Sequence, residues 1–154
     1  MTTMKFAHIE YSIQTKSIDI FNVGCDGFCK NCCNQEIKDW NLPGQSSEFV
    51  LTKVGELISK FNSLIDRFIL VGCDPVDCYK HYPEYLDFII ELKKYNKPIY
   101  LFTRHELDEI PNELKNMVQY IKTGAYIPEL TCDDNICEGI KLATSNQKIY
   151  KMGE

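Results

Sequence analysis

The sequence predicts an α/β fold, built either on an open, mostly parallel sheet or on a small partial (β/α) barrel. Short apolar and β-branched runs alternate along the chain with stretches of helical periodicity. The run Arg67–Gly72 is a short continuous apolar stretch, which is typical of a strand buried on both faces of a parallel sheet. At 154 residues the chain is too short for a closed eight-unit barrel of about 250 residues.

The first half of the chain predicts three strands and one long helix. Residues 6–11 and 17–24 carry enough apolar and β-branched residues to form strands, and Arg67–Gly72 forms the third. Between them a helix is expected from Ser47, which is a suitable N-cap. Its apolar residues recur at helical spacing over four turns, at Val50, Val54, Leu57, Ile58, Phe61, Leu64 and Ile65.

A second helix and a fourth strand are predicted in the middle of the chain. The helix follows Pro83, and Asn96 and Pro98 end it before a strand over residues 99–103. Its apolar stripe consists of Leu86, Ile89 and Ile90. This repeated alternation of strands and helices predicts right-handed crossovers between parallel strands.

The remainder of the chain has a weaker pattern. Residues 106–120 predict a helix that is entered or kinked at Pro111, and residues 120–122 predict a short strand. Residues 125–141 predict a loop, and residues 148–152 a final edge strand.

The composition indicates one globular domain over residues 1–154. It has 44% hydrophobic and 25% charged residues, which excludes disorder and collagen. The 22 acidic and 17 basic residues give a net charge of −5 without a basic run, so nucleic acid is not expected as a partner. The N-terminus has no apolar leader, and no stretch approaches the ~20 apolar residues of a membrane span. We therefore expect a cytoplasmic protein without a membrane segment.

The expected ligand site lies where the parallel strands end. Ligands of such sheets bind beyond the carboxyl ends of the strands. The residues that follow these ends are Cys25 onward, the segment Gly72-Cys-Asp-Pro75, and Thr103-Arg-His105. Arg104 and His105 could there hold a carboxylate or pass a proton, although for His105 a solvated loop position is favoured.

Eight cysteines are unusual for a chain of this composition, and in a cytosolic protein they indicate metal binding or redox chemistry. Cys25, Cys29 and Cys32 form a CxxxCxxC motif on one short loop, with Gly27 supplying backbone freedom. Three thiolates suit a [4Fe-4S] cluster and leave one iron open to another ligand. A zinc loop completed by Cys33 or another residue is the alternative.

The CxxxCxxC motif after a strand resembles the cluster motif of the radical S-adenosylmethionine superfamily, and in particular the activating proteins of anaerobic (class III) ribonucleotide reductases. Cys-Cys-Asn-Gln-Glu followed by Trp40 is similar to that family's sequence after the cluster motif. Gly72-Cys-Asp-Pro75 is similar to its Gly-Gly-Asp/Glu-Pro segment. Residues 122–130 and 144–147 resemble its C-terminal signature. Cys73 departs from the pattern, because it stands where the family has glycine.

The resemblance implies an α/β domain of the radical S-adenosylmethionine type and the reaction of that superfamily. The three motif cysteines would ligate a [4Fe-4S] cluster, and S-adenosylmethionine would chelate its fourth iron. The adenine would lie near Asn31, Cys32 and Cys33, and the methionine near Gly72, Cys73 and Asp74. Reductive cleavage would give a 5′-deoxyadenosyl radical, which takes hydrogen from a glycine of the reductase.

The resemblance also implies partners, namely the large subunit of an anaerobic ribonucleotide reductase and a flavodoxin or ferredoxin as electron donor. Three alternatives stay open: an activase for another glycyl-radical enzyme, a radical enzyme that acts on a small molecule, and a non-catalytic iron–sulfur or zinc module. A second metal site is conceivable, but separate packing roles are favoured for its four candidate cysteines. These are Cys73, Cys78, Cys132 and Cys137.

Overall fold

The structure, a computed structural model, describes residues 4–27 and 35–153 and contains a six-stranded mixed sheet in the order β1-β2-β3-β4-β5-β8. The inner pairs β2–β3, β3–β4 and β4–β5 are parallel, while β1 and β8 pair antiparallel at the two edges. The predicted α/β class is therefore confirmed, with a sheet that is mixed at its edges. The strands are β1 Phe6–Ser12, β2 Ser17–Asn22, β3 Arg67–Gly72, β4 Ile99–Phe102, β5 Tyr120–Thr123 and β8 Lys148–Lys151.

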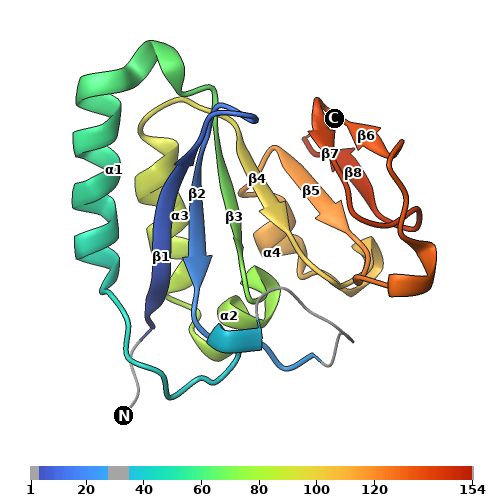
Figure 1. Cartoon of the computed structure of the whole chain (residues 1–154). Helices are drawn as coiled ribbons and strands as arrows, with labels where there is room; N and C mark the ends of the chain where they lie inside the picture. Colours follow the sequence, from blue (N-terminus) through green and yellow to red (C-terminus); the bar gives the residue numbers. More distant parts are fainter. Residues whose placement is uncertain (1–3, 28–34, 154) are drawn as a thin grey trace.

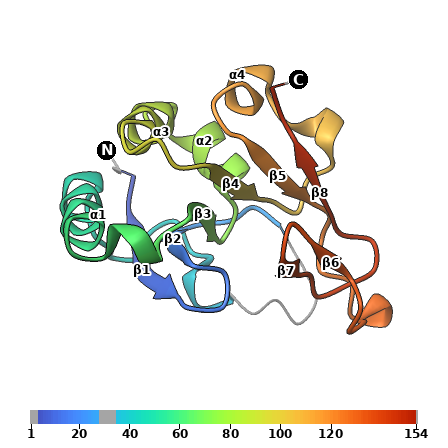
Figure 2. The same cartoon turned by 90° about the horizontal axis from the view of Figure 1, so that it is seen from above.

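The helices cover one face of this sheet, and a small hairpin lies over the other (Figures 1 and 2). Single-turn 3₁₀ segments occur at Gln35–Ile37, Asn62–Leu64, Leu107–Glu109 and Pro128–Leu130. The hairpin pairs β6 (Ile136–Cys137) with β7 (Ile140–Lys141). The helices are α1 Ser47–Phe61, α2 Pro75–His81, α3 Tyr85–Lys93 and α4 Asn112–Lys115.

Both faces of the central strands are buried, because successive side chains point to opposite sides. On β3, Phe68 and Leu70 pack in the large core under the helices. Ile69 packs instead in a second cluster with Tyr100 and with residues near β7. The sheet is thus the middle layer between the helices and the C-terminal segment, as expected for a parallel sheet.

Helix α1 follows the predicted pattern but begins one residue earlier than expected. Its N-cap is Ser46, whose Oγ accepts the backbone N–H of Phe49 at 3.1 Å, so the prediction of Ser47 as the cap is wrong. The helix ends at Phe61, and the last two residues of the predicted stripe follow it, Leu64 in a 3₁₀ turn and Ile65 directly after that turn.

Helix α2 was not predicted. Asp74 is its N-cap, with a side-chain oxygen that accepts the Val76 N–H at 3.0 Å, and Pro75 occupies the first helical position. Asp followed by Pro is a common helix start, because the missing N–H of proline costs nothing there. This helix directly follows β3, at the carboxyl end of that strand.

The helix predicted over residues 106–120 is confirmed only in its entry at Pro111, which is the N-cap of α4, and most of that range is not α-helical. A capping box between Glu106 and Glu109 closes the first turn, and Ile110 and Pro111 are then extended. Only Asn112–Lys115 is α-helical after this break. Likewise, the predicted loop over residues 125–141 contains the β6–β7 hairpin.

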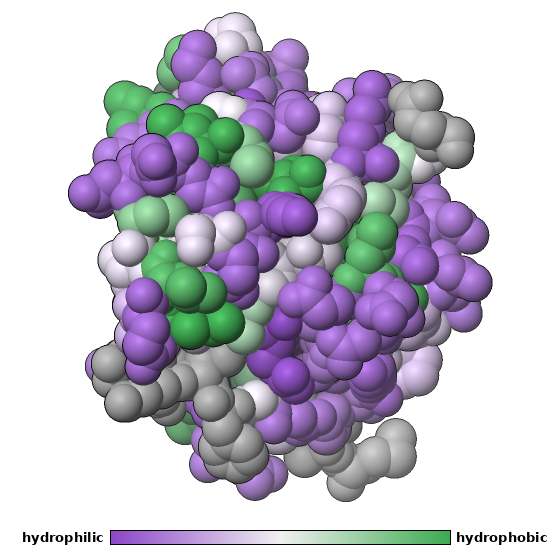
Figure 3. All heavy atoms as spheres, turned by 90° about the vertical axis from the view of Figure 1, so that its right-hand side faces the viewer, coloured by the Kyte–Doolittle hydropathy of each residue, from purple (hydrophilic) through white to green (hydrophobic). Residues whose placement is uncertain are grey.

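The exposed surface on the side of β8 and the hairpin is mainly hydrophilic, with hydrophobic residues in small separate groups (Figure 3). Exposed hydrophobic residues of these elements include Ile136 and Tyr150. Among the helices of the described part of the chain, we find none with the length and apolar character that a membrane crossing requires.

Candidate iron–sulfur site

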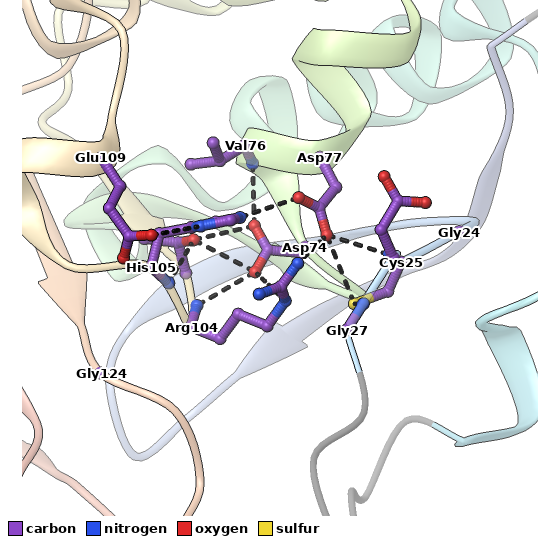
Figure 4. Close-up of polar contacts among 12 residues, drawn as sticks. Gly24, Cys25, Gly27, Asp74, Val76, Asp77, Arg104, His105, Glu109 and Gly124 are labelled. Atoms are coloured by element: carbon purple, nitrogen blue, oxygen red, sulfur yellow. Dashed lines mark hydrogen bonds and ion pairs between the residues drawn. The ribbon is translucent and has the colours of Figure 1, made fainter.

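The ends of three neighbouring strands bring the candidate site together (Figure 4). Cys25 follows β2, Asp74 and Asp77 follow β3, and Arg104 and His105 follow β4. Because these strands are parallel, their carboxyl ends lie at one edge of the sheet. The polar side chains meet at this edge, which is where the sequence predicted the site.

Asp74 joins the ends of β3 and β4. Its buried carboxylate accepts hydrogen bonds from Thr103 Oγ1 at 2.8 and 3.1 Å and from the Arg104 N–H at 3.0 Å, in addition to its capping bond. Burial raises the pKa of this carboxyl, and the nearby charge of Asp77 raises it further. Asp74 therefore fixes the shape of this sheet edge, while its role in binding methionine stays a prediction.

Asp77, on the first turn of α2, is the centre of the polar network and was missed by sequence reasoning. Its Oδ2 accepts the Asp26 N–H at 3.0 Å and the Arg104 guanidinium at 2.9 Å. Its Oδ1 accepts His105 Nε2 at 2.8 Å. Burial alone would raise the pKa of Asp77, but these donors outweigh it and lower the pKa. The Asp74-Pro75 helix start was the signal that could have placed Asp77 here.

His105 is buried, so the expectation of a solvated loop position for it is wrong. Besides the Asp77 bond, its Nδ1 lies 3.9 Å from a carboxylate oxygen of Glu109. Arg104 holds a carboxylate, as the sequence allowed: its guanidinium pairs with Asp77, and its Nε lies 3.8 Å from Asp74 Oδ2.

The Cys25 thiol faces this network directly. Its sulfur lies 3.6 Å from Asp77 Oδ2 and accepts the Gly27 N–H at 3.2 Å. Burial raises the pKa of the thiol to about 11, although the Gly27 amide and the Arg104 guanidinium favour the thiolate. Four further predicted site residues lie outside the described residues: Cys29, Asn31, Cys32 and Cys33.

The structure shows a steric role for Gly27, while the backbone freedom predicted for it stays a prediction. A Cβ at this position would lie 2.2 Å from Arg104 Nε. Any side chain at this position would have to displace the Arg104 side chain, because the backbone at Gly27 lies directly against it.

The two described ends of the cysteine loop are held together by Asp26 and Trp40. Trp40 Nε1 donates to Asp26 Oδ1 at 2.9 Å, and its ring stacks on His81 with centroids 3.8 Å apart. The Gly24 and Cys25 N–H groups donate to the carbonyls of Ile37 and Lys38 at 2.8 and 3.1 Å. The loop therefore leaves and rejoins the fold at one place.

Gly72 and Cys73 form the turn between β3 and α2. Gly72 has φ +114°, and a Cβ there would lie 2.5 Å from the backbone nitrogen of Asn22. The Cys73 N–H donates to the Asn22 carbonyl at 3.3 Å. This turn thus lies directly beside the end of β2, where the cysteine loop begins.

The other cysteines have different surroundings. Cys78 is buried in the helix-side core, where desolvation raises its pKa well above the ordinary thiol value, so the packing role favoured for it is confirmed. Cys132 and Cys137 are half-buried, and Cys137 packs in the second cluster.

Among the described residues, one group of possible metal ligands has its ligand atoms within 4.8 Å of one another, and it consists of Cys25, Asp74 and Asp77. The carboxylate oxygens in this group already accept N–H and O–H donors of the protein. Cys25 is therefore the member that fits a metal centre, and a thiolate suits iron–sulfur clusters.

The segment 144–147 forms a hydrogen-bonded turn. Gln147 Oε1 accepts the N–H groups of Ala143 and Thr144 at 3.1 and 3.2 Å. Its Nε2 donates to the Gly124 carbonyl at 3.2 Å. The turn thereby fixes the end of β5, next to the site.

With a cysteine loop at the carboxyl edge of an α/β sheet, the chain falls in the class of iron–sulfur proteins, because residues 16–148 match a protein family described as "4Fe-4S single cluster domain". The match spans most of the chain, which therefore belongs to this family. Membership supports a [4Fe-4S] cluster over the zinc alternative. A search of curated proteins found no match.

Proposed function

We propose that the protein is a radical S-adenosylmethionine activase, a single domain that generates the glycyl radical of an anaerobic ribonucleotide reductase. When bound, the reduced cluster supplies the electron that cleaves S-adenosylmethionine to methionine and a 5′-deoxyadenosyl radical, which takes hydrogen from a glycine of the reductase. Membership of the cluster family supports the first requirement of this function, a [4Fe-4S] centre.

The observation that carries the proposal is the convergence of three strand ends. Cys25 begins the CxxxCxxC loop at the end of β2, and the Gly72-Cys73-Asp74 turn lies beside it through the Cys73 to Asn22 hydrogen bond. The segments that resemble the cluster motif and the methionine-binding motif are therefore neighbours, although about fifty residues separate them in the sequence.

The residues have distinct tasks in this proposal. Cys25, Cys29 and Cys32 hold the cluster, and the backbone of residues 31–33 binds the adenine side. The Gly72-Cys73-Asp74 turn binds the methionine side. Asp74 keeps this turn in place, because its carboxylate accepts hydrogen bonds both from α2 and from the segment that follows β4.

The proposal includes two partners. The large subunit of the reductase supplies the glycine and closes the site, because a small protein that modifies a glycine inside another protein cannot enclose its whole substrate. A flavodoxin or ferredoxin in the cytoplasm supplies the electron. Both partners follow from the family resemblance.

The test is anaerobic. The protein is reconstituted with iron and sulfide, reduced with dithionite and mixed with S-adenosylmethionine, and 5′-deoxyadenosine is quantified. We expect product from the native chain and none from Cys29→Ala. A matched variant, Cys132→Ala, removes a half-buried cysteine outside the motif and should keep the product.

The outcomes separate the alternatives. Product that disappears in Cys29→Ala establishes the radical chemistry, and added reductase then tests for the glycyl radical by its electron paramagnetic resonance signal. No product from a chain with a full four-iron cluster, even with the reductase present, would favour an electron carrier. If another glycyl-radical enzyme acquires the radical more readily than the reductase does, only the proposed protein substrate changes.

A further inference from the structure

Arg104 lies beside the predicted first cluster ligand, Cys25, and faces the two buried aspartates Asp74 and Asp77 (Figure 4). Its guanidinium is 2.9 Å from Asp77 Oδ2 on one side. On the other side the backbone of the cysteine loop leaves no room for a side chain, since a Cβ at Gly27 would be 2.2 Å from Arg104 Nε. The guanidinium is therefore held against the loop that carries the cysteines.

One donor of this guanidinium has no acceptor in the described part of the chain. Arg104 Nε is buried there without a hydrogen-bond partner. Burying an N–H of a charged group without an acceptor is unfavourable, so such atoms commonly mark a missing partner. This atom lies against Gly27, two residues after Cys25.

The charges around Cys25 explain why a cation is needed. A cysteine that binds iron does so as a thiolate, so the S–H donation from Cys25 to Asp77 then ends. A thiolate would remain 3.6 Å from a carboxylate, with the buried Asp74 close by. Arg104 is a cation at this place: it pairs with Asp77 at 2.9 Å, its Nε lies 3.8 Å from Asp74 Oδ2, and it lies against Gly27 of the cysteine loop.

Asp77 and His105 hold the guanidinium in this position. Asp77 accepts from Arg104 with the same oxygen that faces Cys25, and His105 binds its other oxygen. A guanidinium stays charged in proteins, so the position carries a permanent positive charge.

We propose that Arg104 is the counter-charge of the iron–sulfur centre and raises its reduction potential. The inference rests on the iron–sulfur part of the proposed function, with Cys25 as a ligand, and not on the cleavage of S-adenosylmethionine. The potential of such a cluster depends on nearby charge and on hydrogen bonds to its sulfurs. A fixed guanidinium at Cys25 stabilises the reduced cluster, which carries one more negative charge.

The chain offers a matched control, because it has only two arginines. Arg67 lies at the opposite end of β3, where its guanidinium stacks on Tyr100 at 4.9 Å and donates to the Glu138 carbonyl at 3.0 Å. Arg67→Gln changes the net charge as much as Arg104→Gln does, but far from the cluster loop.

The experiment measures the midpoint potential of the reconstituted cluster in the native protein, Arg104→Gln, Arg104→Lys and Arg67→Gln, by anaerobic redox titration followed by visible absorbance. At the native midpoint, we expect Arg104→Gln to lower the ratio of reduced to oxidised cluster about tenfold, which corresponds to about 59 mV for one electron. The midpoint potential of Arg104→Lys should fall between those of the native protein and Arg104→Gln, and that of Arg67→Gln should match the native protein. If Arg104→Gln loses its cluster while Arg104→Lys keeps it, the need for a charge is likewise supported.

An unchanged midpoint in Arg104→Gln, or an equal shift in Arg67→Gln, would overturn the inference. Loss of the cluster from both Arg104 variants would also overturn it, because a structural role is then sufficient. Iron and sulfide analysis of each sample distinguishes these results. If the native protein holds its cluster but makes no 5′-deoxyadenosine, the radical function is refuted. The comparison of midpoint potentials among the variants stays valid in that case.

Discussion

The replacement Asp77→Asn tests the polar network directly, since Asp77 is its centre. The carboxylate accepts hydrogen bonds from Asp26, Arg104 and His105 at 3.0, 2.9 and 2.8 Å, and its side chain is only 3% exposed. Asparagine has the same shape but one acceptor oxygen and a donor NH₂. With its NH₂ toward Asp26 and Arg104, asparagine faces two N–H donors that the carboxylate had accepted. With its NH₂ toward His105, it needs the tautomer of His105 whose Nε2 accepts a hydrogen bond. In both orientations the negative charge beside Arg104 is lost.

The expected loss follows from these contacts. A hydrogen bond to a charged group contributes about 1.5–3 kcal/mol, and breaking a buried ion pair costs about 3–5 kcal/mol. The Arg104 side chain is 27% exposed, so water can partly replace the lost carboxylate for that side chain. We therefore expect Asp77→Asn to lower the free energy of unfolding by about 3 kcal/mol.

The assay is urea unfolding of the metal-free, reduced protein, followed by circular dichroism. Asp133→Asn is the control, because it makes the same change of charge in a side chain that is 98% exposed and 3.3 Å from Lys141. The control should leave the unfolding free energy unchanged, as is usual for surface ion pairs. A loss in Asp77→Asn of less than about 1 kcal/mol, or equal to that of the control, would refute the central role of Asp77.

The same variant has an expected pH dependence. The folded-state pKa of Asp77 is lowered below its ordinary value of 3.8, because its donors outweigh the effect of burial. The carboxylate therefore contributes its full stability above that value and loses it as the pH falls through the folded-state pKa. The difference between native protein and Asp77→Asn should be constant at neutral pH and shrink in acid, whereas a constant difference down to pH 2 would contradict the reasoning.

Three further predictions follow from single positions. Gly72→Ala should lower the free energy of unfolding by about 3 kcal/mol, because a positive φ and a backbone clash coincide there. The control Gly139→Ala, with φ +75° and nothing within 4 Å of the added Cβ, should lower it by about 1 kcal/mol. Equal urea midpoints for the two variants would contradict this difference. Gly24→Ala should shift the fluorescence of the only tryptophan to the red, because a Cβ there would lie 2.0 Å from the Trp40 ring and must displace it, and an unchanged emission maximum would argue against that contact. Cys78 should react with iodoacetamide roughly tenfold or more slowly in the native protein than in the unfolded one, as judged by mass spectrometry; equal rates would show that it is not buried.

Much of the fold was predictable where one physical signal dominates. The continuous apolar run of β3 gave the observed bounds, since strands buried on both faces tolerate few polar residues. The helix predicted over residues 106–120 is reduced to one α-helical turn after Pro111. Proline at that point favours extended backbone, and the capping box of Glu106 and Glu109 closes a separate turn before it.

The site was predictable in position but only partly in composition. The strand ends placed Cys25, Asp74 and Arg104 at one edge, because parallel strands share that edge whatever their side chains. Asp77 and the burial of His105 were not predictable in the same way. They depend on α2 turning back under the edge, and a partner contributed by another element leaves no local pattern in the sequence.

The second core cluster has a consequence for how the protein is made. The face of the sheet that carries Ile69 and Tyr100 is covered by Ile140 and Leu142, which follow β5 in the chain. During synthesis the helix-side core can therefore form first, while an apolar sheet face and the open edge of β5 stay exposed to other chains. Nascent chains paused after β5 should bind chaperones or aggregate, and release of β6 to β8 from the ribosome ends that exposure.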